Sequence, residues 1–206
     1  VLERAFARRL PAGARICGVD EVGRGPWAGP VCAAAVIFAP GTAPEGLADS
    51  KVISPARRIA LAEAVRGVAE HALGWASVAE IDALGLGAAA DLAMVRAVAG
   101  LAAAPAFAIV DGRRLPRGLG CPGEAVVKGD ARSVSVAAAS ILAKVARDAL
   151  MEDLAAAHPG YGWARNRGYG TPEHRAGLKR LGLTPHHRRS FRPIHNILLE
   201  GRPVTD

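Results

Sequence analysis

Three short apolar segments of this chain each lead into acidic side chains. Residues 15–22, 107–110 and 124–128 are rich in Val, Ile and Ala and are followed by turn residues, which indicates buried β-strands. The acids at or just past their ends are Asp20 and Glu21, Asp111, and Asp130. If the last two strands run parallel to the first, these carboxylates meet at one edge of a sheet, where open α/β sheets bind their ligands.

A single aspartate after an apolar run is usually explained by a turn or a helix cap. Four such acids together favour a ligand site, because clustered carboxylates repel one another and need a cation. Carboxylate oxygens suit Mg²⁺ or Mn²⁺ better than zinc. A set of four acids without His or Cys is typical of phosphoryl-transfer sites in which two ions about 3.5–4 Å apart activate water and stabilise the leaving oxygen.

Asp20 and Glu21 set a geometric condition for such a site. Neighbouring residues of a regular strand point to opposite faces of the sheet. We therefore expect the strand to break or bulge at Glu21, and the glycines at positions 23 and 25 make this plausible.

Gly23, Arg24 and Gly25 form a turn-rich segment between the strand at 15–22 and a further apolar strand at 30–38, which predicts a hairpin. Glycines let the backbone approach a ligand closely and leave N–H groups free to bind phosphate or sugar oxygens. The segment matches neither the dinucleotide-binding nor the P-loop pattern. On its own it is more typical of an ordinary turn.

The longest helical pattern runs over residues 133–157 and carries a polar stripe on an otherwise apolar surface. The stripe consists of Ser133, Ser140, Lys144 and Arg147. Two interpretations stay open: it is a solvated face, or it approaches phosphate groups near Asp130. Other helical patterns lie at 54–68, 80–84, 88–103 and 172–181. Strands mixed with helices in this way predict an α/β domain with a mixed sheet.

The formal net charge of +7 is concentrated in one stretch of the chain. Residues 158–192 hold eight basic and one acidic side chains, with Tyr and Trp among the arginines, whereas the residues before them are close to neutral. Arginine beside aromatic rings suits phosphates, sugars and bases, so we expect a nucleic-acid partner. We divide the chain into a catalytic domain, residues 1–157, and a basic helical segment, residues 158–206, that packs on it and binds substrate.

Composition excludes several classes of protein. No uncharged apolar run is long enough to span a membrane. Cys17, Cys32 and Cys121 form no C-x-x-C pair, which favours buried reduced thiols over a zinc site or a disulfide framework. The histidines show no zinc-binding spacing. We expect a cytoplasmic protein that acts as a monomer without membrane contact.

Six ordered motifs are distributed between residues 18 and 174. They are G-V-D-E-V-G-R-G-P-W-A-G-P-V (18–31), A-D-S-K (48–51), V-D-G (110–112), K-G-D (128–130), A-A-A-S-I-L-A-K-V-A-R-D (137–148) and G-Y-G-T-P-E-H (168–174). In this order they resemble type 2 ribonuclease H, the ribonuclease HII family. The resemblance implies an RNase H-like fold, with a central mixed sheet flanked by helices and a helical C-terminal part. It implies two-metal cleavage of RNA paired to DNA, and of single ribonucleotides in duplex DNA, leaving 3′-hydroxyl and 5′-phosphate ends.

The resemblance also assigns roles to individual residues. The catalytic acids that bind Mg²⁺ or Mn²⁺ match Asp20, Glu21, Asp111 and Asp130. The loop that senses the 2′-hydroxyl of the ribonucleotide matches Gly23, Arg24 and Gly25. The tyrosine that packs on the sugar at the RNA–DNA junction matches Tyr169. Further substrate-contacting positions match Lys51, Ser140 and Lys144.

One motif departs from the family, and two rival functions stay compatible with the residues. Members often have H-K-G-Y-G-T where this chain has Asn166 and Arg167 before G-Y-G-T, so we expect altered local phosphate contacts. A basic binding module would use the acids only as turn formers, yet it gains nothing from four carboxylates beside a phosphate backbone. A nuclease of DNA junctions would share the acids but has no use for a glycine loop and Tyr169 as sugar contacts.

Overall fold

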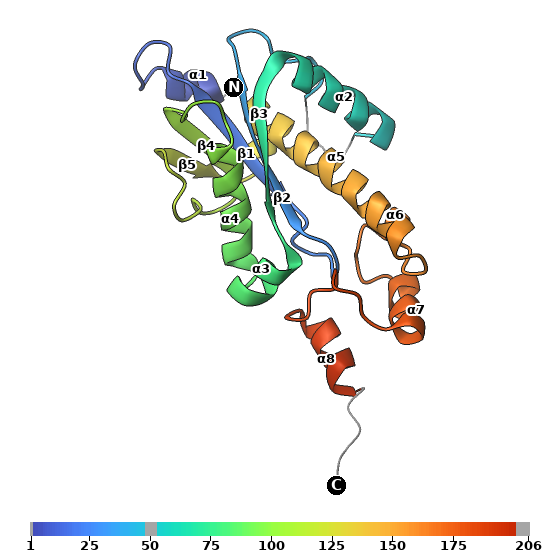
Figure 1. Cartoon of the computed structure of the whole chain (residues 1–206). Helices are drawn as coiled ribbons and strands as arrows, with labels where there is room; N and C mark the ends of the chain where they lie inside the picture. The colour runs from blue at the N-terminus through green and yellow to red at the C-terminus, as the bar shows by residue number, and fades with distance from the viewer. Residues whose placement is uncertain (1, 48–52, 201–206) are drawn as a thin grey trace.

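A five-stranded sheet forms the centre of this computed structural model, which describes residues 2–47 and 53–200 (Figure 1). In order across the sheet, the strands are β3 (Ala69–Ala76), β2 (Val31–Phe38), β1 (Ile16–Val22), β4 (Phe107–Asp111) and β5 (Gly123–Val126). The first three are joined antiparallel, whereas β4 and β5 run parallel to β1. The expected mixed sheet and the hairpin between β1 and β2 are confirmed.

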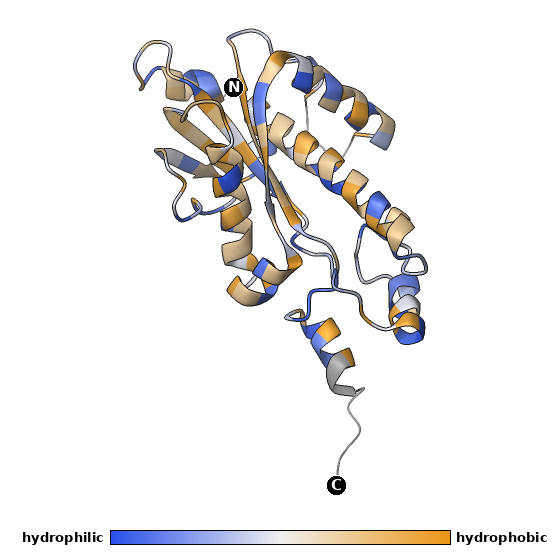
Figure 2. Ribbon diagram, viewed as in Figure 1, coloured by the Kyte–Doolittle hydropathy of each residue, from blue (hydrophilic) through white to orange (hydrophobic). Residues whose placement is uncertain are grey.

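Helices cover both faces of this sheet. In chain order the helices of the described residues are α1 (Leu2–Ala7), α2 (Pro55–Val68), α3 (Val78–Leu84), α4 (Leu86–Ala99), α5 (Val134–Ala157), α6 (Trp163–Asn166), α7 (Pro172–Leu181) and α8 (Arg192–Glu200), with a 3₁₀ turn η1 (Gly129–Ala131). Helix α4 packs on one face, and α2 and α5 pack on the other (Figure 1). In Figure 2 the apolar colour follows the sheet and α4, whereas α7 is mostly hydrophilic.

Two glycines let helices approach the sheet backbone closely. A Cβ at Gly18 of β1 would lie 2.2 Å from the backbone of Ser135 in α5. A Cβ at Gly74 of β3 would lie 2.0 Å from the carbonyl oxygen of Ala93 in α4. Such contact distances leave no room for a side chain. Helix α5 is therefore held directly against β1, which sets where its polar residues lie.

The C-terminal helices lie beyond one end of the sheet, and the end of α5 reaches into them (Figure 1). Met151 of α5 packs in one apolar cluster with Trp163 of α6 and Leu178 of α7. An isolated β-bridge joins Ala28, in the turn between β1 and β2, to His187. The basic segment thus packs on the turn that follows the first acids, while a domain boundary near residue 157 stays a prediction.

The sequence patterns located none of three short helices among the described residues, α1, α6 and α8, although they predicted a helical C-terminal segment that includes the last two. Helices α1 and α6 have six and four residues, too few for a stable isolated helix, and depend on contacts such as that of Phe6 with Phe107. Strand β5 also ends before residue 128, because Lys128 takes the left-handed backbone conformation with φ of 56°.

The remaining expectations concern cysteines and membranes. Cys17 and Cys32 are buried free thiols, as predicted, and Cys121 is a partly buried free thiol. Among the helices of the described residues, none is long and apolar enough to cross a membrane.

Candidate active site

The carboxyl ends of β1 and β4 bring two of the acids side by side. The parallel register pairs Gly18 with Ile109 and then Val19 with Val110, so Asp20 and Asp111 come next. Gly18 and Ile109 pack against α5, and residues two positions further along each strand share that face. Asp20 and Asp111 therefore lie together on the α5 side of the sheet edge.

Glu21 leaves β1 on the opposite face. Strand β1 pairs regularly with β2 as far as Val22, opposite Cys32, so the expected break or bulge at Glu21 is wrong. The backbone N–H of Glu21 donates to Oδ1 of Asp20 at 2.7 Å, and the guanidinium of Arg24 donates to Oε1 of Glu21 at 3.1 Å. The strand end thus presents one acid on each face instead of two on the same face.

Asp130 reaches this region through η1 rather than as the last residue of a strand. The backbone N–H of Gly129 donates to Oδ1 of Asp111 at 2.7 Å, which ties the 3₁₀ turn to the end of β4. Oδ1 of Asp130 accepts the N–H of Ala131 at 3.0 Å. The left-handed conformation of Lys128 makes the sharp turn from β5 into η1 that this arrangement needs.

Burial and like charge raise the pKa values of the acids at the strand end. The pKa of Asp20, which is 8% exposed, lies well above its usual range, because the carboxyl is buried and faces the negative charges of Glu21 and Asp111. A hydrogen bond with Ser140 opposes this rise in the pKa of Asp20. Burial also raises the pKa of Glu21, although Arg24 opposes it. Crowded buried carboxylates of this kind are stabilised by a cation.

The donor set fits Mg²⁺ or Mn²⁺, since every donor is a carboxylate oxygen. Within residues 2–47 and 53–200, no three His, Cys, Asp or Glu side chains are close enough together to hold an ion in the arrangement seen. Glu21 is engaged by Arg24, and Asp111 by the N–H of Gly129. Side-chain rotation would have to bring the acids onto a shared ion.

Gly25 lies close to the ring of Tyr169. A Cβ at Gly25 would stand 3.0 Å from Cε1 of Tyr169, whose side chain is half exposed. Asn166 builds the turn that carries this tyrosine: its main-chain carbonyl accepts the N–H of Tyr169 and its Oδ1 accepts the N–H of Gly168, both at 2.9 Å. Its Nδ2 donates to the carbonyl of Tyr161 at 2.8 Å. The residue that departs from the family motif thus shapes the tyrosine turn.

Two residues of the polar stripe on α5 lie beside the acids or at the protein surface. Ser140 hydrogen-bonds Asp20. Lys144 pairs with Asp148, one turn further along the helix, at 2.6 Å and keeps part of its side chain exposed. Both positions are compatible with contact to a bound phosphate.

The other two members of the stripe are structural. The hydroxyl of Ser133 caps α5 and donates to the carboxylate of Glu3 at 2.6 Å. Arg147 is buried and donates to the carbonyls of Ala28, Pro30 and Arg167 at 2.9–3.1 Å. Neither the solvated-face nor the phosphate-facing interpretation holds for the stripe as a whole, because α5 turns these two residues into the interior.

Comparison with known proteins places this geometry in a family. The family model of ribonuclease HII matches residues 17–194. Ribonuclease HII of Jannaschia sp. is 61% identical over 186 residues, covering 90% of this chain and 94% of that protein. The Paracoccus denitrificans enzyme is 58% identical over 197 residues, covering 95% and 94%. The chain belongs to the ribonuclease HII family. It is accordingly a metal-dependent hydrolase, a ribonuclease H that acts on RNA–DNA hybrids.

The fold agrees with a solved ribonuclease H2 from Pyrococcus horikoshii OT3, with a TM-score of 0.78 at 25% identity, over 90% of this chain and 98% of that one. The RNase H-like α/β fold implied by the sequence motifs is therefore confirmed. Of the substrate positions that ribonuclease HII motifs suggest, Lys51 lies outside the described residues.

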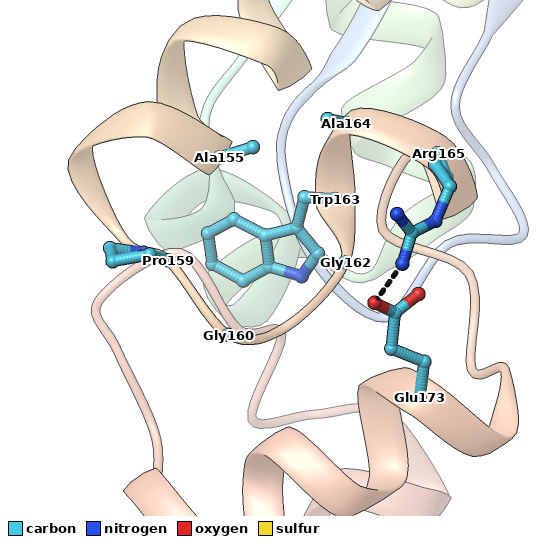
Figure 3. A pocket seen from close by; sticks show the side chains of 8 residues that line it. All are labelled: Ala155, Pro159, Gly160, Gly162, Trp163, Ala164, Arg165 and Glu173. Atoms are coloured by element: carbon cyan, nitrogen blue, oxygen red, sulfur yellow. Dashed lines mark hydrogen bonds and ion pairs between the residues drawn. The ribbon is translucent and has the colours of Figure 1, made fainter.

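The basic segment of this ribonuclease is not a uniformly exposed surface. Arg188 is completely buried, so the expectation that the whole stretch contacts a polyanion is wrong for this side chain. Arg165 is exposed and pairs with Glu173 at one side of a cavity of about 210 Å³, with Trp163 at its wall (Figure 3). The cavity belongs to α5, α6 and α7, and its lining includes none of the four candidate acids.

Sequence reasoning missed Arg188 and the structural role of Asn166. Nothing in the sequence separates Arg188 from the adjacent Arg189, which is exposed. Only the pairing of this segment with the turn between β1 and β2 distinguishes the two arginines.

Proposed function

We propose that this ribonuclease cleaves the RNA strand of RNA–DNA hybrids and also cuts duplex DNA at single embedded ribonucleotides, leaving 3′-hydroxyl and 5′-phosphate ends. The contact between Gly25 and Tyr169 is the observation that carries the proposal. It brings an exposed glycine turn and an exposed aromatic ring together beside the acidic strand ends. A 2′-hydroxyl is what distinguishes RNA from DNA at a given position, and an aromatic ring packs well on sugars and bases.

The glycine turn would recognise the ribose. Backbone groups of Gly23, Arg24 and Gly25 would hydrogen-bond the 2′-hydroxyl, since Arg24 and Gly25 are exposed. Tyr169 would pack on the following sugar, where a second 2′-hydroxyl disturbs the contact. Together these two contacts would favour binding of a junction in which a ribonucleotide is followed by DNA.

The four acids would hold the metal ions. Asp20, Glu21, Asp111 and Asp130 would bind two Mg²⁺ or Mn²⁺ ions, which supply an activated water and charge stabilisation at the leaving oxygen. Ser140 would orient Asp20 and favour its ionised form through its hydrogen bond. No side chain of the site is needed as a nucleophile, so hydrolysis would proceed without a covalent intermediate.

Cations around the site would hold the duplex by its phosphates. Lys144 and the exposed arginines of the basic segment suit such sequence-independent contacts. Because each contact releases counterions, duplex binding would weaken steeply as salt rises. The substrates are then RNA–DNA hybrid and ribonucleotide-containing duplex DNA, bound by one copy of the chain.

The decisive experiment uses three labelled duplexes of one sequence: a DNA duplex with a single ribonucleotide, the all-DNA duplex, and an RNA–DNA hybrid. Each is incubated with the protein in Mg²⁺, in Mn²⁺ and in EDTA. We expect metal-dependent nicking 5′ to the single ribonucleotide, cutting of the hybrid, and an intact all-DNA duplex. The proposal would be refuted if neither ribonucleotide-containing substrate is cut, whether with Mg²⁺ or with Mn²⁺.

The same assay separates the rival functions. Tight duplex binding that is lost on chelation, without any cleavage, would favour a binding module. Cleavage of a branched all-DNA junction in preference to the ribonucleotide substrate would favour a DNA-junction nuclease.

A further inference from the structure

Arg188 occupies the inside of the turn between β1 and β2. Its Nε donates to the carbonyl of Gly29 at 2.9 Å, and Nη1 donates to the carbonyl of Arg24 at 3.1 Å. Its Nη2 donates to the carbonyls of Gly23 at 2.5 Å and Pro30 at 3.3 Å. One guanidinium therefore ties together both ends of the turn, and its planar fork suits four acceptors spread around it.

The backbone of the same segment fixes Arg188 in this place. The N–H of Arg188 donates to the carbonyl of Trp27 at 2.8 Å, and the N–H of Gly29 donates to the carbonyl of His186 at 2.9 Å. The ring of Phe191 lies 5.0 Å from the guanidinium carbon and covers it. The side chain is 0% exposed, so it cannot contact a phosphate of a bound duplex.

This buried cation has no carboxylate bonded to it among the described residues. Asp82 favours its charge, but the oxygens of Asp82 accept hydrogen bonds from Arg189 and Ser190 instead. Burial and the nearby positive charge of Arg147 lower the pKa of Arg188 to about 9. A buried charge is costly unless its donors are satisfied, and here main-chain carbonyls alone satisfy them.

The carbonyl contacts decide which way the turn's N–H groups face. In a trans peptide the C=O and the following N–H point in opposite directions, and the part of the chain that the structure describes contains no cis peptide bonds. Because the carbonyls of Gly23 and Arg24 point at Arg188, the N–H groups of Arg24 and Gly25 point away from it. Both residues are exposed, and no acceptor within residues 2–47 and 53–200 receives either N–H. Hydrogen bonding of a carbonyl to a cation also polarises its peptide and strengthens the N–H as a donor.

We propose that Arg188 is a positioning residue for ribose recognition, which holds the carbonyls of Gly23 and Arg24 inward so that the N–H groups of Arg24 and Gly25 face the 2′-hydroxyl. This rests on the proposed function, since it assumes that the glycine turn contacts the sugar. Arg188 acts through the turn and never touches substrate. Loss of the Arg188 side chain frees the peptide groups of Gly23 and Arg24 to rotate. The preference for ribose over deoxyribose then decreases more than the affinity for duplex does.

The test measures that discrimination directly. Fluorescence anisotropy in EDTA gives the dissociation constants for a duplex with one ribonucleotide and for the all-DNA duplex of the same sequence. The all-DNA dissociation constant divided by the single-ribonucleotide constant measures the preference for ribose. This ratio does not depend on the fraction of folded protein, so a merely structural role leaves it unchanged. We expect Arg188→Gln to lower the wild-type ratio roughly tenfold, the effect of one lost hydrogen bond to the sugar. Arg188→Lys keeps the charge but loses the fork, and an intermediate ratio is expected.

Arg189→Gln is the matched control, because it removes the same charge from the adjacent exposed position. It should weaken the binding of both duplexes alike and keep their ratio. A wild-type ratio in folded Arg188→Gln would overturn the proposal. If Arg188→Gln does not fold, the ratio in Arg188→Lys decides by the same criterion.

A second measurement separates this inference from the proposed function. Nitrogen-15 relaxation of the free protein should give order parameters of about 0.85 for the N–H groups of Arg24 and Gly25, and values below about 0.6 in Arg188→Lys. If wild-type protein neither prefers nor cuts ribonucleotide duplexes, the proposed function fails, while the relaxation data still test whether Arg188 orders the turn. Equal order parameters in the two proteins would overturn the positioning role.

Discussion

Tyr169 lies so close to Gly25 that a Cβ at position 25 would stand 3.0 Å from Cε1 of its ring. The two residues are far apart in the chain and come from separate turns, one after β1 and one after α6. Their contact joins the two elements that we assign to ribose recognition into one surface. A substitution at one of these residues should therefore shift the position of the other.

Gly25→Ala should impair cleavage while leaving the fold intact. The backbone at Gly25 is not left-handed, so alanine fits its conformation, and the stability change should stay within about 1 kcal/mol. The added methyl displaces the Tyr169 ring by several tenths of an ångström, and we expect cleavage at a single ribonucleotide to fall by about tenfold. Initial rates and thermal melts of both proteins provide the check.

Gly23→Ala is the contrasting variant. Gly23 has φ of +94°, and a Cβ there would lie 2.3 Å from Nε of the buried Arg147. This variant should lose more than about 2 kcal/mol of unfolding free energy. Similar melting temperatures for the two alanine variants would contradict this account of the turn.

Asp111→Asn should abolish cleavage and keep duplex binding measurable. The substitution removes a carboxylate that we propose binds metal, while retaining the shape of the side chain, and it relieves the negative charge that raises the pKa of Asp20. We therefore expect the melting temperature at neutral pH to stay level or rise. Single-turnover cleavage and anisotropy binding measure the two effects, and wild-type cleavage by this variant would rule out the metal assignment.

Tyr169→Ala should affect the two substrates unequally. The ring is half exposed, so its removal costs little stability, but it removes the contact that we propose with the sugar after the ribonucleotide. Cleavage of the single-ribonucleotide duplex should fall at least tenfold more than cleavage of a continuous RNA–DNA hybrid. Tyr169→Phe retains the ring and serves as the control. Equal losses on both substrates would mean that Tyr169 has only a structural role.

Acid should destabilise the C-terminal part through two buried histidines. The N–H of Thr184 donates to Nδ1 of His187 at 2.9 Å, so this nitrogen must stay unprotonated. Nε2 of His187 lies 3.0 Å from Nε2 of His174, which accepts the indole N–H of Trp163. Burial and the neighbouring His174 lower the pKa of His187 from 6.5 to about 4. The pKa of His174 is lowered too, mainly by burial.

The sign of the pH dependence follows from these shifts. Between pH 4 and 6.5 His187 is protonated in the unfolded chain but stays neutral in the folded chain. Its contribution to the free energy of unfolding is therefore complete above pH 6.5 and is lost as the pH falls towards 4. The slope contributed by His187 should approach about 1.4 kcal/mol per pH unit. Urea titrations across this range measure it. His187→Gln should flatten the slope, whereas replacement of the exposed His195 by Gln should not; a flat wild-type profile would contradict the assignment.

Much of the fold could be predicted because its signals are local. Apolar runs ended by turn residues located β1, β2 and β4, and the helical pattern at 54–68 located α2. The irregularity expected at Glu21 was wrong, since the strand stays regular and the acid takes the opposite face. The short helix α6 escaped prediction because its four residues are held by the burial of Trp163, which is a tertiary contact.

The sequence by itself determined which chemistry is present: four acids, a glycine turn, a tyrosine and a basic stretch, in an order that identifies the family. Only the tertiary structure decided how they meet. Parallel pairing of β1 with β4 puts Asp20 beside Asp111, and the bridge between Ala28 and His187 buries Arg188 inside the glycine turn. The local pattern of a segment shows that it forms a strand or a turn, but it does not show which distant segment it pairs with or which of its polar side chains that pairing buries.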